Sequence, residues 1–258
     1  MLYCGTLWWT PRERELLKVK LAEGGPVDRW IIAEATHTFR GNRRELRAPE
    51  IDASVADRVT CVVADNSKVR GTHVPACRTR NAIQRDATLR GVSLREDDVF
   101  VFCDLDEIIH RGDWEAIATA ARRYGYVLAA MRNYYGKLNL MSPKLWDTVF
   151  AVSGQFLRDR RPRTVDKLRR QRHESTGPPT IPIRGQHFGW LRPGKDTTLW
   201  DMKARNNSRQ MAQPTTRKRL EAGRSPSGAT LIRVDVDHTY PQAILDNMTY
   251  WTNFVEPA

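Results

Sequence analysis

Three carboxylates follow directly on a strongly apolar run near the middle of the chain. Residues 99–103 are Val, Phe, Val, Phe and Cys, and Asp104, Asp106 and Glu107 come next. A run of β-branched and aromatic residues predicts a strand that is buried on both faces. Side chains two apart on a strand project to the same side, so we expect Asp104 and Asp106 to converge. They would do so at the carboxyl end of the strand, where open α/β sheets bind ligands.

Two hard oxygen donors on one side suit Mg²⁺ or Mn²⁺, with phosphate oxygens of a ligand completing the shell. Asp104 and Asp106 are therefore the candidate metal ligands, and together with Glu107 they are the candidate catalytic residues. Glu107 either assists this site by orienting its ligands or only begins the next turn. Strand-terminal carboxylates occur in nucleotide-sugar glycosyltransferases, phosphatases and nucleases. The spacing alone leaves these classes open.

The segments that must hold these residues alternate between strand and helix patterns. We expect strands at residues 1–9, 27–35, 59–64, 99–103, 126–131 and 230–236, and helices at 12–23, 78–89, 113–124 and 241–254. This alternation predicts an α/β fold with a mostly parallel central sheet flanked by helices. After residue 135 the pattern weakens, and residues 174–186 read as a Gly- and Pro-rich loop. We find no internal repeat, so residues 1–258 are expected to form a single domain.

Size and composition limit the class of protein. The chain has 258 residues, of which 40% are hydrophobic. No apolar run reaches the roughly 18–20 residues that a membrane span needs, and the amino-terminal pattern is not that of a signal peptide. We therefore expect a soluble, cytoplasmic protein, or one in the host cytoplasm if it is viral. The 4 cysteines form no CxxC pair and are expected to be reduced and structural.

The charge of the chain is strongly positive. Lys and Arg number 42 against 30 Asp and Glu, giving a formal net charge of +12. Such a surplus attracts polyanions, above all nucleic acid, although a solvated basic surface is the alternative. The densest basic run, residues 158–172, is either a solvated helical face or a surface that contacts acceptor phosphates. Its candidate contact residues are Arg160, Arg161, Arg163, Arg169 and Arg170.

Further motifs occur in a fixed order before the carboxylates. They are Trp-Ile-Ile-Ala-Glu-Ala at 30–35, Thr-Phe-Arg-Gly at 38–41 and Arg-Asn at 80–81. This order resembles glycosyltransferase family 17, the bisecting N-acetylglucosaminyltransferases of GT-A type. Its members show a strand ending in Glu, a TFxG turn, an Arg-Asn pair and a DxDE element. Later segments extend the resemblance, more patchily, over nearly the whole chain: His187-Phe188 with Trp190, Lys203, and residues 240–247.

The resemblance implies a metal-dependent transferase with a GT-A fold. Residues 1–135 would bind a nucleotide sugar, with a UDP-sugar as the expected donor, and residues 136–258 would form the acceptor side. It also implies transfer of a hexosyl or N-acetylhexosaminyl group with inversion. Two departures stand out, because Gln186 replaces a family Trp and Arg209 falls near a family His.

The resemblance also suggests roles for single residues, each with an alternative. Glu34 would accept hydrogen bonds from the base or ribose, or would pair with a neighbouring Arg. Asp104 would lie on the metal shell or contact the ribose of the donor. Arg80 and Asn81 would hold the diphosphate or nucleoside, or would lie on a solvated helix face. Trp8 would line the donor pocket or pack in the core. His187 would be the third metal ligand or an acceptor contact, with His238 as the other candidate.

The general base and the acceptor are less determined. Glu174, Asp147 and His187 are the candidate bases. A compact basic transferase fits a polyanionic acceptor, and we expect a hydroxymethylated base in viral DNA, such as 5-hydroxymethylcytosine in a bacteriophage. The first alternative is a cytosolic transferase acting on a glycan, a lipid-linked sugar or a protein side chain. The second is a non-catalytic nucleic-acid-binding protein.

Overall fold

The strands that the structure describes form one mixed sheet. The computed structural model describes residues 1–9, 13–38, 40–160, 164–170, 177–189, 191, 218–220 and 222–256. Within these residues the sheet has 10 strands, in the order β10-β7-β6-β8-β4-β1-β2-β3, with β9 beside β6 and β5 beside β9. The strands are β1 Leu2–Trp8, β2 Arg29–Ala35, β3 Val59–Ala64, β4 Val99–Phe102, β5 Glu107–Ile108, β6 Tyr126–Tyr135, β7 Leu140–Met141, β8 Trp146–Ser153, β9 Thr180–Gly189 and β10 Ile232–Arg233.

The first four strands are parallel and confirm the largely parallel α/β prediction. β1 pairs with β2 on one side and with β4 on the other, and β3 continues from β2. The chain therefore runs outward from β1 to β3 and returns to the opposite side of β1 as β4. Such a reversal of strand order opens a crevice at the carboxyl ends of the two strands involved. The carboxylates after β4 lie at this point.

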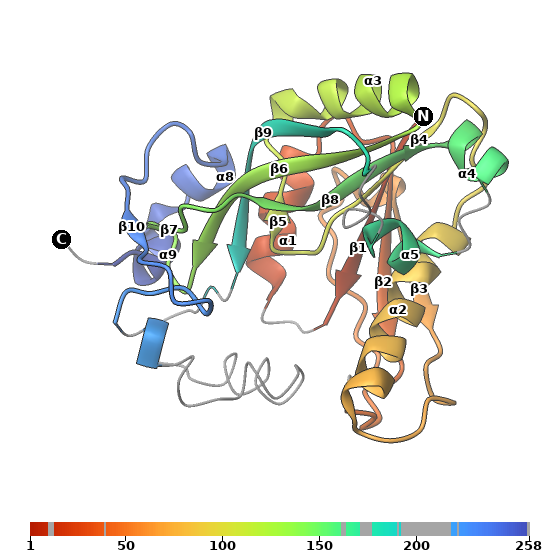
Figure 1. Ribbon diagram of the computed structural model, residues 1–258, viewed down its shortest axis with the longest axis horizontal. Coiled ribbons are helices and arrows are strands. Elements are labelled where there is room, and N and C mark those ends of the chain that lie inside the picture. Colours follow the sequence, from red (N-terminus) through yellow and green to blue (C-terminus); the bar gives the residue numbers. More distant parts are fainter. Residues whose placement is uncertain are drawn as a thin grey trace.

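Helices cover both faces of the sheet (Figure 1). α1 (Arg14–Glu23) and α3 (Trp114–Tyr124) pack on one face with the odd-numbered residues of β4, Val99 and Val101. α2 (Val74–Arg90), α4 (Gly154–Arg160) and α5 (Val165–Arg170) lie on the other face, with Phe100 and Phe102. All four residues of β4 are completely buried, as the apolar run predicts. A third cluster joins the ends of β6 and β9 to α8 (Gln242–Leu245) and α9 (Met248–Trp251).

The second half of the chain differs from the sequence prediction. Residues 180–189, expected mostly as loop, form strand β9, which runs parallel to β6 across a register shift between Ala130 and Arg132. Pro182 lies beside this irregularity, a place where a sheet tolerates proline. β8, which was not predicted, inserts antiparallel between β4 and β6. The expected closing helix is divided into two short helices and a 3₁₀ turn. Among the described helices none has the length and hydropathy to cross a membrane.

Candidate active site

The chain turns immediately after β4, and this turn carries the carboxylates. β4 ends at Phe102, and the N–H of Glu107 donates to the carbonyl of Asp104 at 3.0 Å. Asp104 and Asp106 therefore lie in a turn rather than on an extended strand, so strand alternation does not align them as predicted. Glu107 begins β5 and lies opposite His187 of β9. The turn, not the strand, sets the directions of the carboxylates.

Asp104 is bound by two guanidinium groups that the sequence did not place near it. Nη1 of Arg169 lies 2.8 Å from its Oδ2, and Nη2 of Arg85 lies 3.5 Å from the same atom. Both guanidinium groups also lie over the ring of Phe102. The amide of Asn81, with its oxygen toward Arg85, accepts from that residue at 3.0 and 3.1 Å. Burial raises the pKa of Asp104, but the charges of Arg169 and Arg85 outweigh burial and hold it below its usual value.

Glu107 is a fully buried anchor. It is 0% exposed, and its Oε2 accepts from the backbone N–H of Asp104 at 2.6 Å. Its Oε1 accepts from Trp146 Nε1 at 2.5 Å, from the hydroxyl of Thr148 and from Arg169 Nη2 at 3.1 Å. Donors thus occupy both oxygens. Of the two predicted roles, orienting the site is the one that this geometry supports.

Lys20 fixes the turn from the opposite face of the sheet. It lies on α1 and is 1% exposed. Its Nζ donates to the carbonyl of Asp104 at 2.9 Å and to that of Glu107 at 2.5 Å. A buried ammonium group is tolerated only when its donors are paired, so Lys20 and the turn stabilise each other.

Asp106 faces His187, which is distant in sequence. The Nε2 of His187 lies 3.8 Å from Oδ2 of Asp106. The other ring nitrogen, Nδ1, lies 2.8 Å from Oδ1 of Asn133, whose amide nitrogen donates to Tyr135. Because the amide oxygen accepts, Nδ1 carries a proton, and Nε2 is the ring nitrogen that faces Asp106. The ring also stacks on Trp146, with centroids 4.0 Å apart and planes at 9°.

This pair fits a divalent cation. A carboxylate oxygen and an imidazole nitrogen are both ligands of divalent transition metals, and here they face each other at 3.8 Å. Asn133 and Trp146 hold the imidazole as outer-shell partners hold metal-binding histidines. Within the described residues no three His, Cys, Asp or Glu side chains gather as a metal cluster. A Mg²⁺-type site needs only one or two protein ligands when substrate phosphates supply the rest.

Glu34 and Trp8 are both engaged with the loop that follows β2. Glu34 is 6% exposed and accepts from the N–H of Arg47 at 3.0 and 3.1 Å and from Arg44 at 3.4 Å. Pairing with a neighbouring Arg is therefore seen, and contact with a base or ribose stays a prediction. Trp8 is 2% exposed in the core below α1, and its Nε1 donates to the carbonyl of Arg47 at 2.7 Å. The core alternative holds for Trp8, because strand alternation turns its ring inward.

Arg80 braces loops instead of facing solvent. It is 2% exposed, and its Nη2 donates to the carbonyls of Val69 at 2.6 Å and Gly71 at 2.8 Å. The solvated-face alternative is therefore wrong for Arg80. Asn81, its neighbour, joins the site indirectly through Arg85.

The basic run has no single environment. Arg169 is on α5, as expected for a helical segment, but only 10% of its side chain is exposed, because it neutralises Asp104 and Glu107. The prediction that it contacts an acceptor polyanion from the surface is wrong. Arg158 pairs with Glu96 at the surface. Arg161 and Arg163 lie outside the described residues, as do the side chains of Arg160 and Arg170.

The remaining predicted site residues are either exposed or outside the described residues. Asp147, a candidate base, is exposed on β8 between Trp146 and Thr148, which both reach Glu107, so strand alternation turns Asp147 to the other face of the sheet. Glu174, Trp190, Lys203 and Arg209 lie outside the described residues. His238 is exposed in the loop after β10, so His187 is the histidine that reaches Asp106.

Sequence reasoning missed the residues that complete the site from other elements. These are Lys20, Arg85, Asn133, Trp146 and Thr148. One local signal existed, a lysine placed among the apolar residues of the first helix. The others follow only from strand and helix packing. These residues lie too far from Asp104 in the sequence to form one local motif with it.

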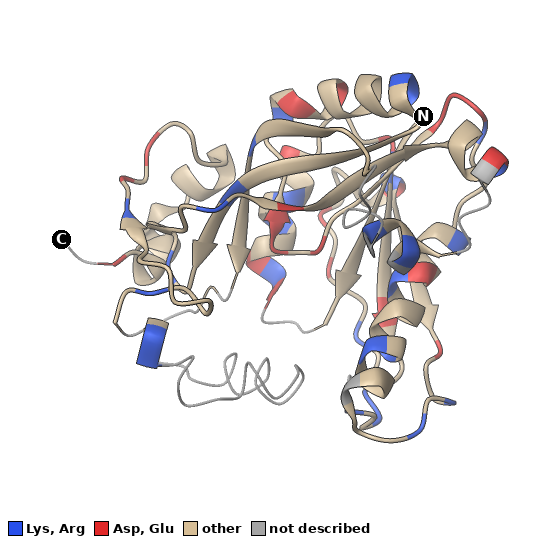
Figure 2. Cartoon of the chain, viewed as in Figure 1, with Lys and Arg blue, Asp and Glu red and all other residues tan. Residues whose placement is uncertain are grey.

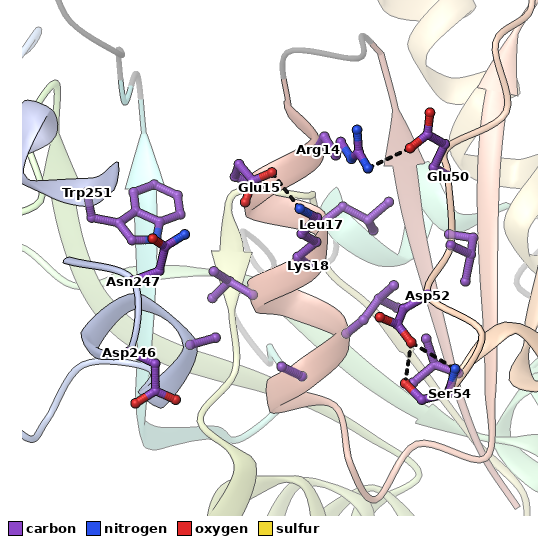
Figure 3. Close-up of a pocket in the computed structure, with 16 residues that line it drawn as sticks. Arg14, Glu15, Leu17, Lys18, Glu50, Asp52, Ser54, Asp246, Asn247 and Trp251 are labelled. Carbon is purple, nitrogen blue, oxygen red and sulfur yellow. Dashed lines mark hydrogen bonds and ion pairs between the residues drawn. The ribbon is translucent and has the colours of Figure 1, made fainter. Parts of the chain in front are cut away.

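A hollow of about 660 Å³ lies away from these carboxylates, between α1, residues 50–55 and the carboxyl-terminal helices (Figure 3). Its charges are largely paired with neighbours: Arg14 with Glu50 at 2.5 Å and Lys18 with Glu15 at 2.8 Å. Its lining includes no residue of the turn after β4. We therefore place the candidate active site at the turn and not in this hollow.

Comparisons with known proteins assign no family. No family model and no curated protein matches the chain. Among solved structures, 4-diphosphocytidyl-2C-methyl-D-erythritol synthase from Anaerococcus prevotii matches with a TM-score of 0.38 and 7% identity, over 71% of this chain and 87% of that one. TarS 1-349 from S. aureus matches with a TM-score of 0.36 and 10% identity, over 62% of this chain and 49% of that one. Similarity at this level does not carry a function.

Proposed function

We propose that the protein is a metal-dependent glycosyltransferase of GT-A type that uses a nucleoside diphosphate sugar. The observation that carries the proposal is the convergence of Asp106 and His187 beside the Asp104–Arg169–Arg85 cluster. This convergence lies at the carboxyl end of β4, where the strand order reverses, which is the expected ligand position in an open α/β sheet.

Asp106 and His187 would hold the divalent ion. An imidazole nitrogen in the ligand set favours Mn²⁺ over Mg²⁺, which prefers oxygen alone. When bound, the ion would neutralise charge that develops on the departing diphosphate. Asn133 and Trp146 keep the imidazole in one tautomer and orientation.

Asp104 would act by orienting Arg169 and Arg85 beside the diphosphate, not as a metal ligand. Its carboxylate is already neutralised by Arg169 at 2.8 Å, so an ion at the same oxygen would have to displace a guanidinium group. Arginine is well suited to phosphate contact, because its planar fork of donors matches phosphate oxygens. Glu107 and Lys20 would hold this arrangement in place.

In the proposed reaction the bond between the anomeric carbon and the diphosphate oxygen breaks as a bond to the acceptor oxygen forms. The electron pair of the broken bond leaves with the diphosphate, and the acceptor proton passes to a base. Asp147 is one candidate base. Glu174 is the other candidate, and His187 is assigned to the ion instead.

For the acceptor we propose a hydroxymethylated base in DNA, as in a bacteriophage genome. The support is the net charge of +12, which favours a polyanionic acceptor. Transfer to a glycan, a lipid-linked sugar or a protein side chain in the cytoplasm is the alternative. Incubation with hydroxymethylated DNA and labelled sugar nucleotides tests the acceptor, and absence of incorporation with every donor would reject it.

Donor and ion are tested by thermal unfolding with a panel of nucleotide sugars, with and without Mn²⁺. A donor at about 100 times its Kd should raise Tm by roughly 5–10 °C, and only when Mn²⁺ is present. Asp106→Asn and His187→Gln should each abolish the Mn²⁺-dependent part of this shift. Glu115→Gln, on an exposed face of α3, is the matched control and should leave it unchanged. A donor shift that is equal without Mn²⁺ would refute the metal assignment.

A non-catalytic nucleic-acid-binding protein is the second candidate, favoured by the charge surplus alone. The two differ in their response to Asp106→Ala. A transferase loses turnover and metal-dependent donor binding with this change. A protein that only binds nucleic acid keeps its DNA affinity and has no donor-induced shift to lose.

A further inference from the structure

The loops that follow β2 and β3 are braced into one surface. The N–H of His37 donates to Asn66 Oδ1 at 2.9 Å, and Asn66 Nδ2 donates to the carbonyl of His37 at 3.1 Å. Arg80 holds the carbonyl of Gly71 from below. It also lies so close to Gly41 that a Cβ there would be 2.6 Å from its Nη2. Buried side chains therefore fix residues 36–38 and 40–47 beside residues 65–71.

The long side chains on this surface are basic and exposed. Figure 2 shows several basic positions, in blue, at the lower right, around α2 and on the neighbouring loops. They are Arg40, Arg43, Lys68, Arg70 and Arg78. Within the part of the chain that the structure describes, none of the five has an acidic partner. The nearby Glu45 is already paired with Arg47 at 2.6 Å.

An open hollow of about 620 Å³ adjoins these residues, lined by Thr36, Arg43, Arg44, Glu45 and Leu46. Arg44 is engaged with Glu34, so Arg43 supplies the exposed positive charge. Leu46 is 44% exposed and offers an apolar contact beside it. A cation next to an apolar contact suits a ligand that alternates phosphates with sugars and bases.

The hollow beside α1 has a different charge pattern. The hollow beside α1 is lined by four carboxylates, Glu15, Glu50, Asp52 and Asp246 (Figure 3). Two of these carboxylates are paired with Arg14 and Lys18 of the same hollow, whereas the five cations of the loops after β2 and β3 have no acidic partner among the described residues. Five cations spread over two loops and a helix exceed what one diphosphate can contact, but they match the repeated phosphates of a polymer.

We propose that Arg40, Arg43, Lys68, Arg70 and Arg78 form a surface that binds the phosphate backbone of a nucleic acid. Its part in presenting an acceptor rests on the proposed function, whereas the binding itself does not. The surface follows the carboxyl ends of β2 and β3, the same edge of the sheet as the carboxylates after β4. A bound strand would therefore lie along the edge that holds the site.

The test is the salt dependence of DNA affinity, measured by fluorescence anisotropy of a labelled oligonucleotide duplex without donor or metal. Each phosphate contact contributes about 0.9 to the slope of log K against log salt. The triple variant Arg43→Ala, Arg70→Ala, Arg78→Ala should lower this slope by roughly 2.7. The control triple variant Arg90→Ala, Arg123→Ala, Lys144→Ala changes net charge equally at exposed positions elsewhere and should keep the wild-type slope.

Three outcomes would overturn the proposal. They are equal losses in the two triple variants, an unchanged slope in the first, and no DNA binding by the wild type. A triple variant that loses donor-induced thermal stabilisation while keeping DNA affinity would assign the surface to the donor instead. The proposed function fails by a different result, absence of any Mn²⁺-dependent donor shift. The two failures are therefore separable.

Discussion

The geometry of the site predicts different roles for Glu107 and Asp106, one in stability and the other in activity. Both carboxylates belong to one short motif, yet Glu107 is completely buried and Asp106 has 20% of its side chain exposed. If Glu107 is an anchor, Glu107→Gln should cost stability. Asp106→Asn should cost activity and leave stability nearly unchanged.

The size of the stability loss expected for Glu107→Gln follows from the contacts of Glu107. Gln at this position lacks the charge that neutralises Arg169 and turns an N–H₂ group toward donors such as Trp146 and Thr148. Breaking a buried ion pair by removing one partner costs about 3–5 kcal/mol. For a chain of this size that is a fall in Tm of roughly 6–20 °C. Glu107→Ala removes more and is expected to fold poorly.

The assay is urea unfolding of both variants, followed by tryptophan fluorescence and by circular dichroism. Glu115→Gln is the control, because its pair with Arg122 is exposed and worth about 0–1 kcal/mol. A double-mutant cycle with Arg169→Met should show a coupling energy of about 0.5–3 kcal/mol. The anchor assignment is refuted if Glu107→Gln lies within 1 kcal/mol of wild type, or if Asp106→Asn is the more destabilised variant.

Three further outcomes are expected. Lys20→Met should lower the free energy of unfolding, measured in urea, by about 3–5 kcal/mol, because two buried carbonyls lose their donor. A change below about 1 kcal/mol would show that the turn does not need the Lys20 ammonium group. The pKa of Asp104 is lowered in the fold, so its stabilising contribution is present above the unfolded pKa and is lost as pH falls through the folded value. Below about pH 4, unfolding free energy should therefore fall more steeply in wild type than in Asp104→Asn, and equal slopes would contradict the assignment. Native labelling with a thiol reagent should modify exposed Cys61 and leave buried Cys4 and Cys103 until unfolding, with early loss of all thiols as the contrary result.

The parallel half of the fold could be predicted because its signals are local. Each of its elements is predicted by a pattern within a dozen neighbouring residues. Examples are the apolar run before Asp104, the helix at 113–124 and the strand at 29–35. Prediction failed where an element depends on its neighbours. β9 contains Pro182 and Gly185, which argue against a strand, yet pairing with β6 makes it one. The same holds for the buried state of Arg169, whose sequence neighbours are mostly basic.

The sequence by itself determined that a strand ends in carboxylates at the ligand-binding edge of an α/β sheet. Only the tertiary structure decided what each carboxylate does. Arg169 reaches Glu107 across 62 residues, and Lys20 does so across 87. Sequence periodicity predicts which face of a helix or strand is apolar, but it does not predict which distant residue will pair with a buried charge. Packing makes that choice, because a buried charge must find its partner wherever the fold brings one within reach.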